Sequence, residues 1–356
     1  MDEKITYKNA GVDIDAGNEA VRRIKNILAG SPRIVDGGEE LGKIGGFSGV
    51  FRPFLKHMED PLLVASTDGV GTKLLLALEH NKLDGVGRDL VAMSVNDLIV
   101  CGAMPIFFLD YIATAKLEPD QIEKIVGSIN QACRESDCLL IGGECAEMPG
   151  MYAPGHTDLA GFAVGLVDRT ELIDGSTVKP GDIVMGIASS GLHSNGFSLV
   201  RKVIEKAGWK CDDKLPGCSE VMIDTVMEPT KLYVNPLKIL FKELGTGPNG
   251  GVKACAHITG GGLLENVHRV IPDGLGINFK KGSWDRHAIF GLIQEVAKIS
   301  DEEMLRTFNC GIGMTVIVGK ENAYKVEEVL GGVGEKVYRI GEIVERPMNH
   351  PPVVFV

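Results

Sequence analysis

The residues from Ser66 to Lys73 combine the side chains that a metal and nucleotide site requires. They read Ser-Thr-Asp-Gly-Val-Gly-Thr-Lys and overlap an apolar run, Leu62 to Thr67, that is typical of a buried strand. Glycine amides at a helix start can bind phosphate oxygens, the Asp68 carboxylate can hold Mg²⁺, and the Lys73 ammonium can neutralise charge. The order Gly-Thr-Lys differs from a Walker A motif. The alternative is a plain glycine turn in which Asp68 caps the next helix.

A polar pair interrupts the apolar helix that we expect from Arg88 to Cys101. Asn96 and Asp97 lie there among leucine and valine, and Asp89 falls on the same helix face two turns earlier. Burying a carboxylate is costly unless a cation or hydrogen-bond donors accompany it. If this helix packs beside Asp68, the pair faces the same site. Otherwise it forms an internal hydrogen-bonded contact.

Gly142, Gly143 and Glu144 follow a strand that we expect from Cys138 to Gly142. A carboxylate on a glycine turn at the carboxyl end of a strand lies where α/β sheets bind ligands. The alternative is an ordinary transition from strand to loop with exposed acids.

The segment from Ser189 to Gly196 joins a strand to a helix and carries three serine hydroxyls, the His193 imidazole and the Asn195 amide. Such groups can bind a phosphate or a polar substrate, or perform acid–base chemistry. The alternative is a helix start that is capped by serine or asparagine and carries a solvated histidine.

Two further positions carry weaker signals. His257 precedes Ile258 and Thr259 and then three glycines, again between a strand and a helix, where a lone histidine is more often structural. Cys310 lies between Asn309 and Gly311, but no dedicated base accompanies it, so we do not expect a cysteine nucleophile.

Alternating strand and helix patterns predict the mixed α/β class, with two α/β domains at residues 1–170 and 171–356. The boundary falls in the turn-rich segment from Asp168 to Asp182, which contains Pro180 and Gly181. The expected helices are 18–28, 71–80, 88–101, 120–135, 197–207 and 230–244. The expected strands are 62–67, 106–113, 138–142, 160–167, 182–189, 276–279, 313–318 and 337–344, with a further strand running into the glycines of 254–262.

The composition excludes several classes of protein. The 356 residues include 37 Lys and Arg against 48 Asp and Glu, and this net charge of -11 repels nucleic acid. Eight cysteines without a CxxC pair are typical of reduced thiols. We expect a cytoplasmic protein without a membrane partner, because the start lacks an apolar signal segment and no apolar run is long enough for a span.

Taken in order, motifs along almost the whole chain resemble those of the phosphoribosylformylglycinamidine cyclo-ligase family, also called aminoimidazole ribonucleotide synthetases. Three positions depart from the expected pattern: Cys145 replaces a threonine, Leu192 a proline and Phe197 a tyrosine. None of these changes removes a charged group. The motifs are Tyr7 to Asn18 (YKNAGVDIDAGN), Thr67 to Lys73, Val95 to Leu98, Gly142 to Glu144, Met148 to Tyr152, His193 to Gly196, His257 to Gly262 and Arg306 to Gly311.

The resemblance implies a reaction and a set of site residues. ATP would phosphorylate the formyl amide oxygen of formylglycinamidine ribonucleotide, and a nitrogen would then attack that carbon, closing the imidazole ring and releasing phosphate and ADP. The catalytic residues would be His193, Asp68 and Asp97, of which the two aspartates would hold Mg²⁺. The implied nucleotide-binding residues are Lys25, Gly45, Gly46, Gly49, Lys73, Asn96, Gly142, Gly143 and Glu144, and the implied substrate-binding residues are Ser194, Asn195, His257 and Thr259.

The resemblance also implies a homodimer in which strands of the N-terminal domain form a β-barrel with those of a second subunit. Two other functions are compatible with the same residues. One is a sibling ATP-dependent synthetase or kinase of the superfamily. The selenophosphate synthetase among these siblings would need a reactive cysteine near the start, whereas the first cysteine here is Cys101. The other is a non-catalytic ATP-binding subunit.

Overall fold

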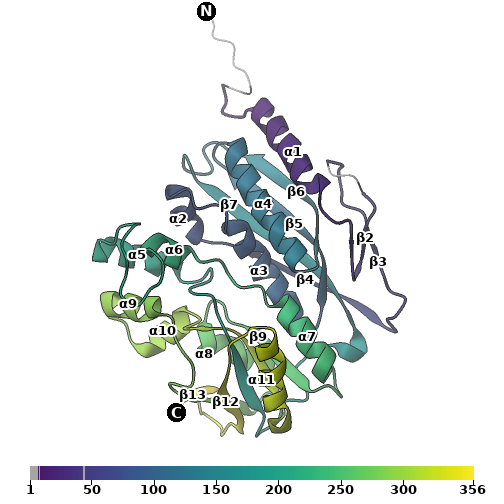
Figure 1. Cartoon of the computed structure of the whole chain (residues 1–356), viewed down its shortest axis with the longest axis vertical. Coiled ribbons are helices and arrows are strands. Elements are labelled where there is room, and N and C mark those ends of the chain that lie inside the picture. Colours follow the sequence, from purple (N-terminus) through teal and green to yellow (C-terminus); the bar gives the residue numbers. More distant parts are fainter. Residues whose placement is uncertain (1–6, 8, 43–44) are drawn as a thin grey trace, which may run out of the picture. The chain divides into compact units, whose positions relative to one another are not determined.

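The computed structural model has a mixed α/β fold and describes residues 7, 9–42 and 45–356, so Lys8 of the first motif lies outside the described residues (Figure 1). The chain forms two compact units. The N-terminal unit contains the residues up to His57, Ala65–Val95 and Pro105–Gly165, and the C-terminal unit contains Met58–Val64, Asn96–Met104 and Leu166–Val356. Helix α3 (Val86–Ile99) contributes residues to both units.

The larger sheet of the N-terminal part has four strands in the order β4-β7-β5-β6, with β5 and β6 parallel. Helices α1 and α4 pack against each other, and α4 packs on β6 through one apolar side that includes Ile122, Ile125 and Ile129. Pro119 starts α4, where the missing amide hydrogen costs nothing. The strands are β4 (Pro61–Gly69), β5 (Met104–Thr114), β6 (Leu139–Glu147) and β7 (Thr157–Asp168), and the helices are α1 (Ile14–Ala29), α2 (Lys73–Glu79), α3 and α4 (Pro119–Glu135).

A small antiparallel sheet of β1 (Ile34–Val35), β2 (Gly38–Glu40) and β3 (Phe51–Pro53) packs on part of the larger sheet. Its Val35 and Phe51 join a hydrophobic cluster with Leu139, Ile141, Phe107 and Leu109, in which the rings of Phe51 and Phe107 lie 5.4 Å apart. On the larger sheet, Tyr111 is 39% exposed and Phe162 is 42% exposed.

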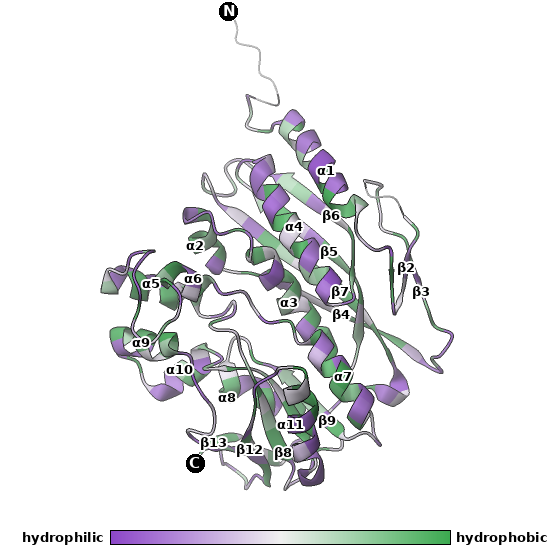
Figure 2. Cartoon of the chain, viewed as in Figure 1, coloured by the Kyte–Doolittle hydropathy of each residue, from purple (hydrophilic) through white to green (hydrophobic). Residues whose placement is uncertain are grey.

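The C-terminal unit is built on a six-stranded sheet in the order β13-β10-β12-β8-β11-β9. Strand β11, which lies between β8 and β9, is buried along its whole length, so both of its faces are covered. Figure 2 shows the hydrophobic colour concentrated in these strands and on the inner sides of the helices. The strands are β8 (Ile183–Ala188), β9 (Val252–His257), β10 (Leu275–Phe279), β11 (Ile312–Val318), β12 (Val337–Glu345) and β13 (Val353–Phe355). The α-helices are α5 (Phe197–Ala207), α6 (Met222–Met227), α7 (Val234–Leu244), α8 (Gly262–Asn266), α9 (Ala288–Ala297), α10 (Asp301–Thr307) and α11 (Ala323–Gly332).

Most of the predicted elements are confirmed, and three differ clearly at one end. Helix α1 begins at Ile14 instead of Asn18, because the Asp13 side chain caps it by accepting the Asp15 and Ala16 amides. Strand β6 continues to Glu147 instead of ending at Gly142, because it stays paired with β5 as far as Thr114. Helix α7 begins at Val234 instead of Thr230. Pro236 in its first turn marks this late start, since proline is tolerated there but not deeper in a helix.

All eight cysteines are free thiols, and Cys133, Cys138, Cys255 and Cys310 are buried. No helix in the described part of the chain is both long enough and apolar enough to span a bilayer.

Candidate active site

Asp68 lies at the end of β4, in the predicted glycine turn. Its carboxylate Oδ1 accepts a hydrogen bond of 2.7 Å from the Gly69 amide. Gly71 has a φ of +71°, a left-handed conformation that glycine adopts without strain. Helix α2 then starts at Lys73 with Thr72 as its N-cap and no side-chain cap bond. Thr72, four residues after Asp68, thus occupies the N-cap position of this helix.

Lys73 is completely buried in the N-terminal unit. Its ammonium forms an ion pair of 2.9 Å with the equally buried Asp89. Asp89 thus supplies the counter-charge for a lysine that the sequence assigns to a nucleotide phosphate. The nucleotide-binding role of Lys73 stays a prediction.

Asn96 is buried and links three segments of the C-terminal unit. Its Oδ1 accepts a 2.9 Å hydrogen bond from the Tyr233 amide, and its Nδ2 donates a 2.9 Å bond to the Lys231 carbonyl. The same Nδ2 lies 3.4 Å from His257 Nε2. These bonds are the internal contact that the sequence leaves open as an alternative for this polar pair.

Asp97, the next residue, combines a buried partner with an accessible carboxylate. Its Oδ1 lies 2.9 Å from Nδ1 of His257, whose side chain is 2% exposed, while the Asp97 side chain is 43% exposed. The structure therefore brings together two predicted site residues, one from α3 and one from the end of β9. The histidine holds one carboxylate oxygen in place, and the carboxylate remains open to solvent.

The sequence predicts a turn at the end of a strand for Gly142, Gly143 and Glu144, and this prediction is wrong. They lie inside β6, paired with Leu109, Asp110 and Tyr111 of β5. Glycine is needed at position 143, because a Cβ there would lie 2.9 Å from the Asp110 carbonyl oxygen and closer still to its carboxylate. Glu144 itself is exposed.

His193 is buried in the C-terminal unit, with 1% of its surface exposed, so the solvated histidine considered above is wrong. Its Nε2 accepts a 3.2 Å hydrogen bond from the Ser190 amide, and its ring lies 6.3 Å from that of Tyr233. A φ of +61° gives it an uncommon backbone conformation for a residue with a side chain. Through these contacts His193 holds in place the loop that carries the predicted substrate-binding residues.

The other predicted substrate residues lie in the two loops that follow β8 and β9. Ser194 is buried, with its hydroxyl 2.8 Å from that of Thr230. Asn195 and Thr259 are half-buried, and the Thr259 carbonyl accepts the Gly262 amide at 3.0 Å. Helix α5 has Gly196 as its N-cap without a side-chain bond, so the alternative of a serine or asparagine cap is also wrong.

Lys25 is exposed on α1, and its side chain lies against Gly45, which is followed by the exposed Gly46 and Gly49. These four predicted nucleotide-binding residues belong to the N-terminal unit. The structure thus places the Lys25 side chain against Gly45, a contact that the sequence alone does not predict.

Cys310 is buried, and burial raises the pKa of its thiol to about 12. Since the thiolate is the nucleophilic form, this cysteine is inert near neutral pH. Its Sγ donates to the Met304 carbonyl at 3.3 Å.

Two residues that contact Asn96, Lys231 and Tyr233, are not among the site residues that the sequence predicts, because both fall inside the expected helix 230–244. Tyr233 is fully buried, and its hydroxyl donates a 2.9 Å bond to the Ala188 carbonyl at the end of β8. Burial raises its pKa well above the usual value, so it stays a neutral donor. Lys231 forms an ion pair with Glu335. Pro236 was the available signal, because it limits how far the helix can extend backwards.

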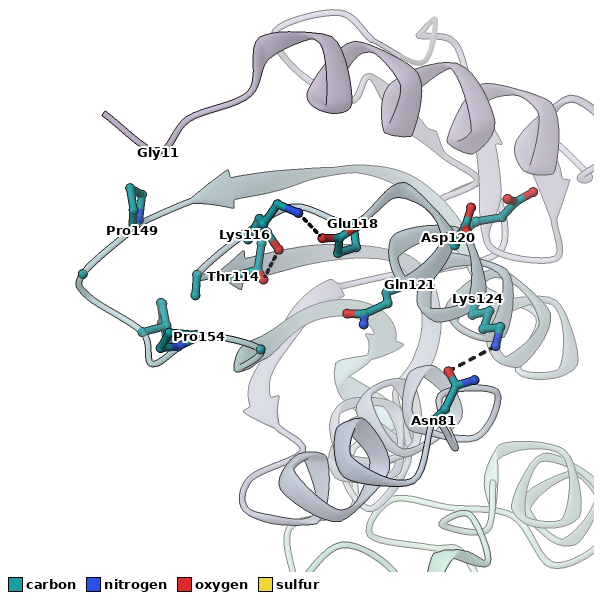
Figure 3. Close-up of a pocket in the computed structure, with 15 residues that line it drawn as sticks. Gly11, Asn81, Thr114, Lys116, Glu118, Asp120, Gln121, Lys124, Pro149 and Pro154 are labelled. Carbon is teal, nitrogen blue, oxygen red and sulfur yellow. Dashed lines mark hydrogen bonds and ion pairs between the residues drawn. The ribbon is translucent and has the colours of Figure 1, made fainter. Parts of the chain in front are cut away.

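A wide pocket of about 1220 Å³ lies in the N-terminal unit beside motif residues Pro149, Gly150 and Tyr152. Figure 3 shows its polar edge, where Lys116 contacts Glu118 at 2.6 Å and Lys124 contacts Asn81 at 3.3 Å. None of the predicted site residues lines this pocket.

The donor set fits Mg²⁺ only in part. Asp68 in the N-terminal unit and Asp97 in the C-terminal unit each offer the hard carboxylate oxygens that this ion prefers. Among the residues that the structure describes, no three His, Cys, Asp or Glu side chains gather as a complete metal site. Mg²⁺ held by either carboxylate would therefore take most of its ligands from substrate phosphates and water, which is its usual coordination in phosphoryl-transfer enzymes.

Comparison with known proteins identifies the family. Residues 49–167 match the N-terminal domain of AIR synthase related proteins, and residues 179–351 match the C-terminal domain. Phosphoribosylformylglycinamidine cyclo-ligase of Polaromonas sp. strain JS666 is 52% identical over 96% of this chain and 95% of its own, and that of Citrifermentans bemidjiense is 48% identical over 96% of each. A crystal structure of thiamine-monophosphate kinase from Stenotrophomonas maltophilia shares the fold, with a TM-score of 0.65, 15% identity and 95% coverage of both chains. The chain therefore belongs to the phosphoribosylformylglycinamidine cyclo-ligase family of AIR synthase related proteins.

Proposed function

We propose that this chain closes the imidazole ring of aminoimidazole ribonucleotide in purine biosynthesis, from formylglycinamidine ribonucleotide and ATP. The observation that carries the proposal is the near-complete match, at about half identity, to relatives named for this reaction. The γ-phosphoryl group of ATP is transferred to the formyl amide oxygen. An amidine-side nitrogen then attacks that carbon, so that a C–N bond forms, the C–O bond breaks, and phosphate leaves beside ADP.

The nucleotide side of the reaction is assigned to carboxylates and glycine-rich segments. Asp68 and Asp97 would hold Mg²⁺, which offsets charge on the phosphates during transfer. The hydrogen bonds from Gly69 to Asp68 and from His257 to Asp97 support this role, because each fixes one oxygen of a carboxylate. Lys25, Gly45, Gly46, Gly49, Asn96, Gly142, Gly143 and Glu144 are assigned to the nucleotide.

Lys73 enters this assignment as a positioning residue. Its ammonium is taken up by Asp89 in the core, immediately after the turn that carries Asp68. A fixed α2 start holds that turn in place. Lys73 would thus act on the phosphates through the backbone of the turn.

The substrate side is assigned to Ser194, Asn195, His257 and Thr259. His193 orients this loop, since its ring holds the Ser190 amide and packs beside Tyr233. This orienting role explains a buried histidine better than direct proton transfer, which requires contact with the reacting group.

The assembly is a homodimer of chains with domains at 1–170 and 171–356. Tyr111 and Phe162 support the dimer, because both are large apolar side chains exposed on a sheet. A second copy that continues this sheet as an intersubunit barrel would cover them.

The test is to measure ADP release from ATP and Mg²⁺ by the purified chain, with and without formylglycinamidine ribonucleotide, together with the aminoimidazole product. The proposal expects substrate-dependent ADP in a one-to-one ratio with aminoimidazole. ADP without ring closure would assign a sibling activity. Tight ATP binding without any turnover would assign a non-catalytic subunit.

A further inference from the structure

A second pocket of the N-terminal unit gathers positive charge in an otherwise acidic chain. It has a volume of about 190 Å³ and lies between the end of α1, the segment before β1, the end of α4 and the start of β6. Its polar lining comprises Lys25, Ser31, Arg33, Glu40, Asn130 and Arg134.

The cations of this pocket are poorly compensated. Glu40 is the one carboxylate among the lining residues, and its oxygen lies 3.8 Å from Arg33. In the described ranges, neither Lys25 nor Arg134 has a carboxylate within ion-pair distance. Three cations against one carboxylate leave two excess positive charges. The chain as a whole has a net charge of -11, so this local excess is not a general property of its surface.

A buried amide points to a ligand independently of the charge. Asn130 is 8% exposed and lines the pocket. Its Oδ1 accepts a 3.0 Å bond from the Ser31 hydroxyl, whereas its Nδ2 has no protein partner among residues 7, 9–42 and 45–356. Buried amide groups normally find a partner, so an acceptor in the pocket would complete this side chain.

Helix dipoles oppose an anion here but do not outweigh the cations. The carboxyl ends of α1 and α4 lie at the pocket, and each helix end acts as roughly half a negative charge. Together they offset about one of the two excess positive charges. A net positive pocket remains, with the Asn130 amide as a donor that has no protein partner in the described part of the chain.

We propose that this pocket binds a phosphate-sized oxyanion, held by Arg134, Arg33 and Lys25 and by the amide of Asn130. The pocket is smaller than the roughly 300–1000 Å³ of sites for whole drug-sized ligands, so it takes one phosphate group, free or at the end of a monoester. The inference goes beyond the proposed reaction and shares only Lys25 with the nucleotide assignment.

The location is tested by soaking crystals of the full chain with tungstate, a tetrahedral oxyanion with strong anomalous scattering. We expect an anomalous peak between Arg134 and Asn130 in the parent chain. The peak should be lost in Arg134→Gln and kept in Lys124→Gln. Lys124 is a matched control because it lies on the same helix, outside this pocket.

The affinity is tested in solution by titrating inorganic phosphate, and separately ribose 5-phosphate, into the chain saturated with Mg²⁺ and ADP. Thermal denaturation reports binding. Arg134→Gln should weaken the phosphate component about tenfold, the loss of one charge-assisted hydrogen bond, while Lys124→Gln leaves it unchanged. Response to phosphate alone identifies free phosphate as the ligand, and a stronger response to the monoester identifies a phosphorylated metabolite.

Two results would overturn the proposal. One is the absence of a tungstate peak in the pocket. The other is a peak accompanied by identical titrations of parent and Arg134→Gln, which would mean an adventitious ion only. Because these readouts are binding and not turnover, either result leaves the proposed reaction untouched.

Discussion

At the scale of single residues, the ion pair of Lys73 and Asp89 should be especially sensitive to mutation, because neither side chain has access to water. Removing one partner leaves a buried charge without compensation, which costs about 3–5 kcal/mol. Lys73→Met should therefore lower the free energy of unfolding in urea by roughly that amount.

The double variant Lys73→Met/Asp89→Leu separates this explanation from simple loss of packing. It removes both charges, so it should recover a large part of the lost stability. An additive loss in the double variant would show that charge compensation is not what the pair provides.

Asp68 and Asp97 are residues whose change should affect turnover and not folding. Asp68→Asn and Asp97→Asn each keep the size of the side chain but remove the charge assigned to the metal. We expect ADP formation to fall at least about a hundredfold, with circular dichroism and melting temperature close to those of the parent. Full activity in either variant would refute the metal assignment for that residue.

At the scale of elements, β5 and β6 can approach because position 143 has no side chain. Gly143→Ala places a Cβ against Asp110, which is overpacking and should destabilise the chain by about 1–3 kcal/mol in urea unfolding. Gly142→Ala is the matched control. Its Cβ would meet only the Leu109 side chain, at 3.3 Å, and that side chain can shift. Equal effects of the two changes would contradict the close contact.

Asp110 gives the same strand pair a dependence on pH. Burial raises the pKa of its carboxyl from 3.8 to about 7, so the folded state favours the protonated form. The contribution of protonated Asp110 to the free energy of unfolding is present in full below about pH 4 and is lost as the pH rises through 7. Asp110→Asn removes it. The variant should gain stability relative to the parent as the pH rises from 4 to 8, by at most about 4 kcal/mol. A constant difference between the two unfolding curves would argue against the shift.

The elements also show what sequence patterns could predict here. Apolar periodicity located α1, α3, α4 and α5 and the central strands, because burial of one side leaves a pattern in the residues themselves. The end of β6 was missed because its glycines are typical of a turn. They instead make room for Asp110, which is distant in sequence. The contact between Asp97 and His257 was likewise invisible, since 160 residues separate the two.

The partners of buried polar residues depend on the same long-range packing. The family motifs marked Lys73 and His193 as important, but a motif does not tell whether a side chain faces a ligand or the core. Both are buried in the structure. We therefore infer from the structure that Lys73 and His193 hold the adjacent loops in place, which the motifs alone could not predict.

At the scale of the whole molecule, the proposed homodimer depends on the exposed apolar residues of the N-terminal sheet. Phe162, 42% exposed on β7, should become buried when a second chain continues this sheet. A carboxylate in its place would be desolvated at the interface without a partner, which is strongly unfavourable. Phe162→Glu should thus convert the parent dimer into single chains of 38.2 kDa in light-scattering chromatography.

Tyr324→Glu controls for the loss of an exposed aromatic ring. Tyr324 is 71% exposed on α11 of the C-terminal unit, outside the sheet that would pair. This variant should remain a dimer at every concentration at which the parent is one. A parent chain that elutes as a monomer would refute the homodimer itself. A dimer that survives Phe162→Glu unchanged would instead place the interface elsewhere, because a buried unpaired carboxylate cannot be accommodated without loss of affinity.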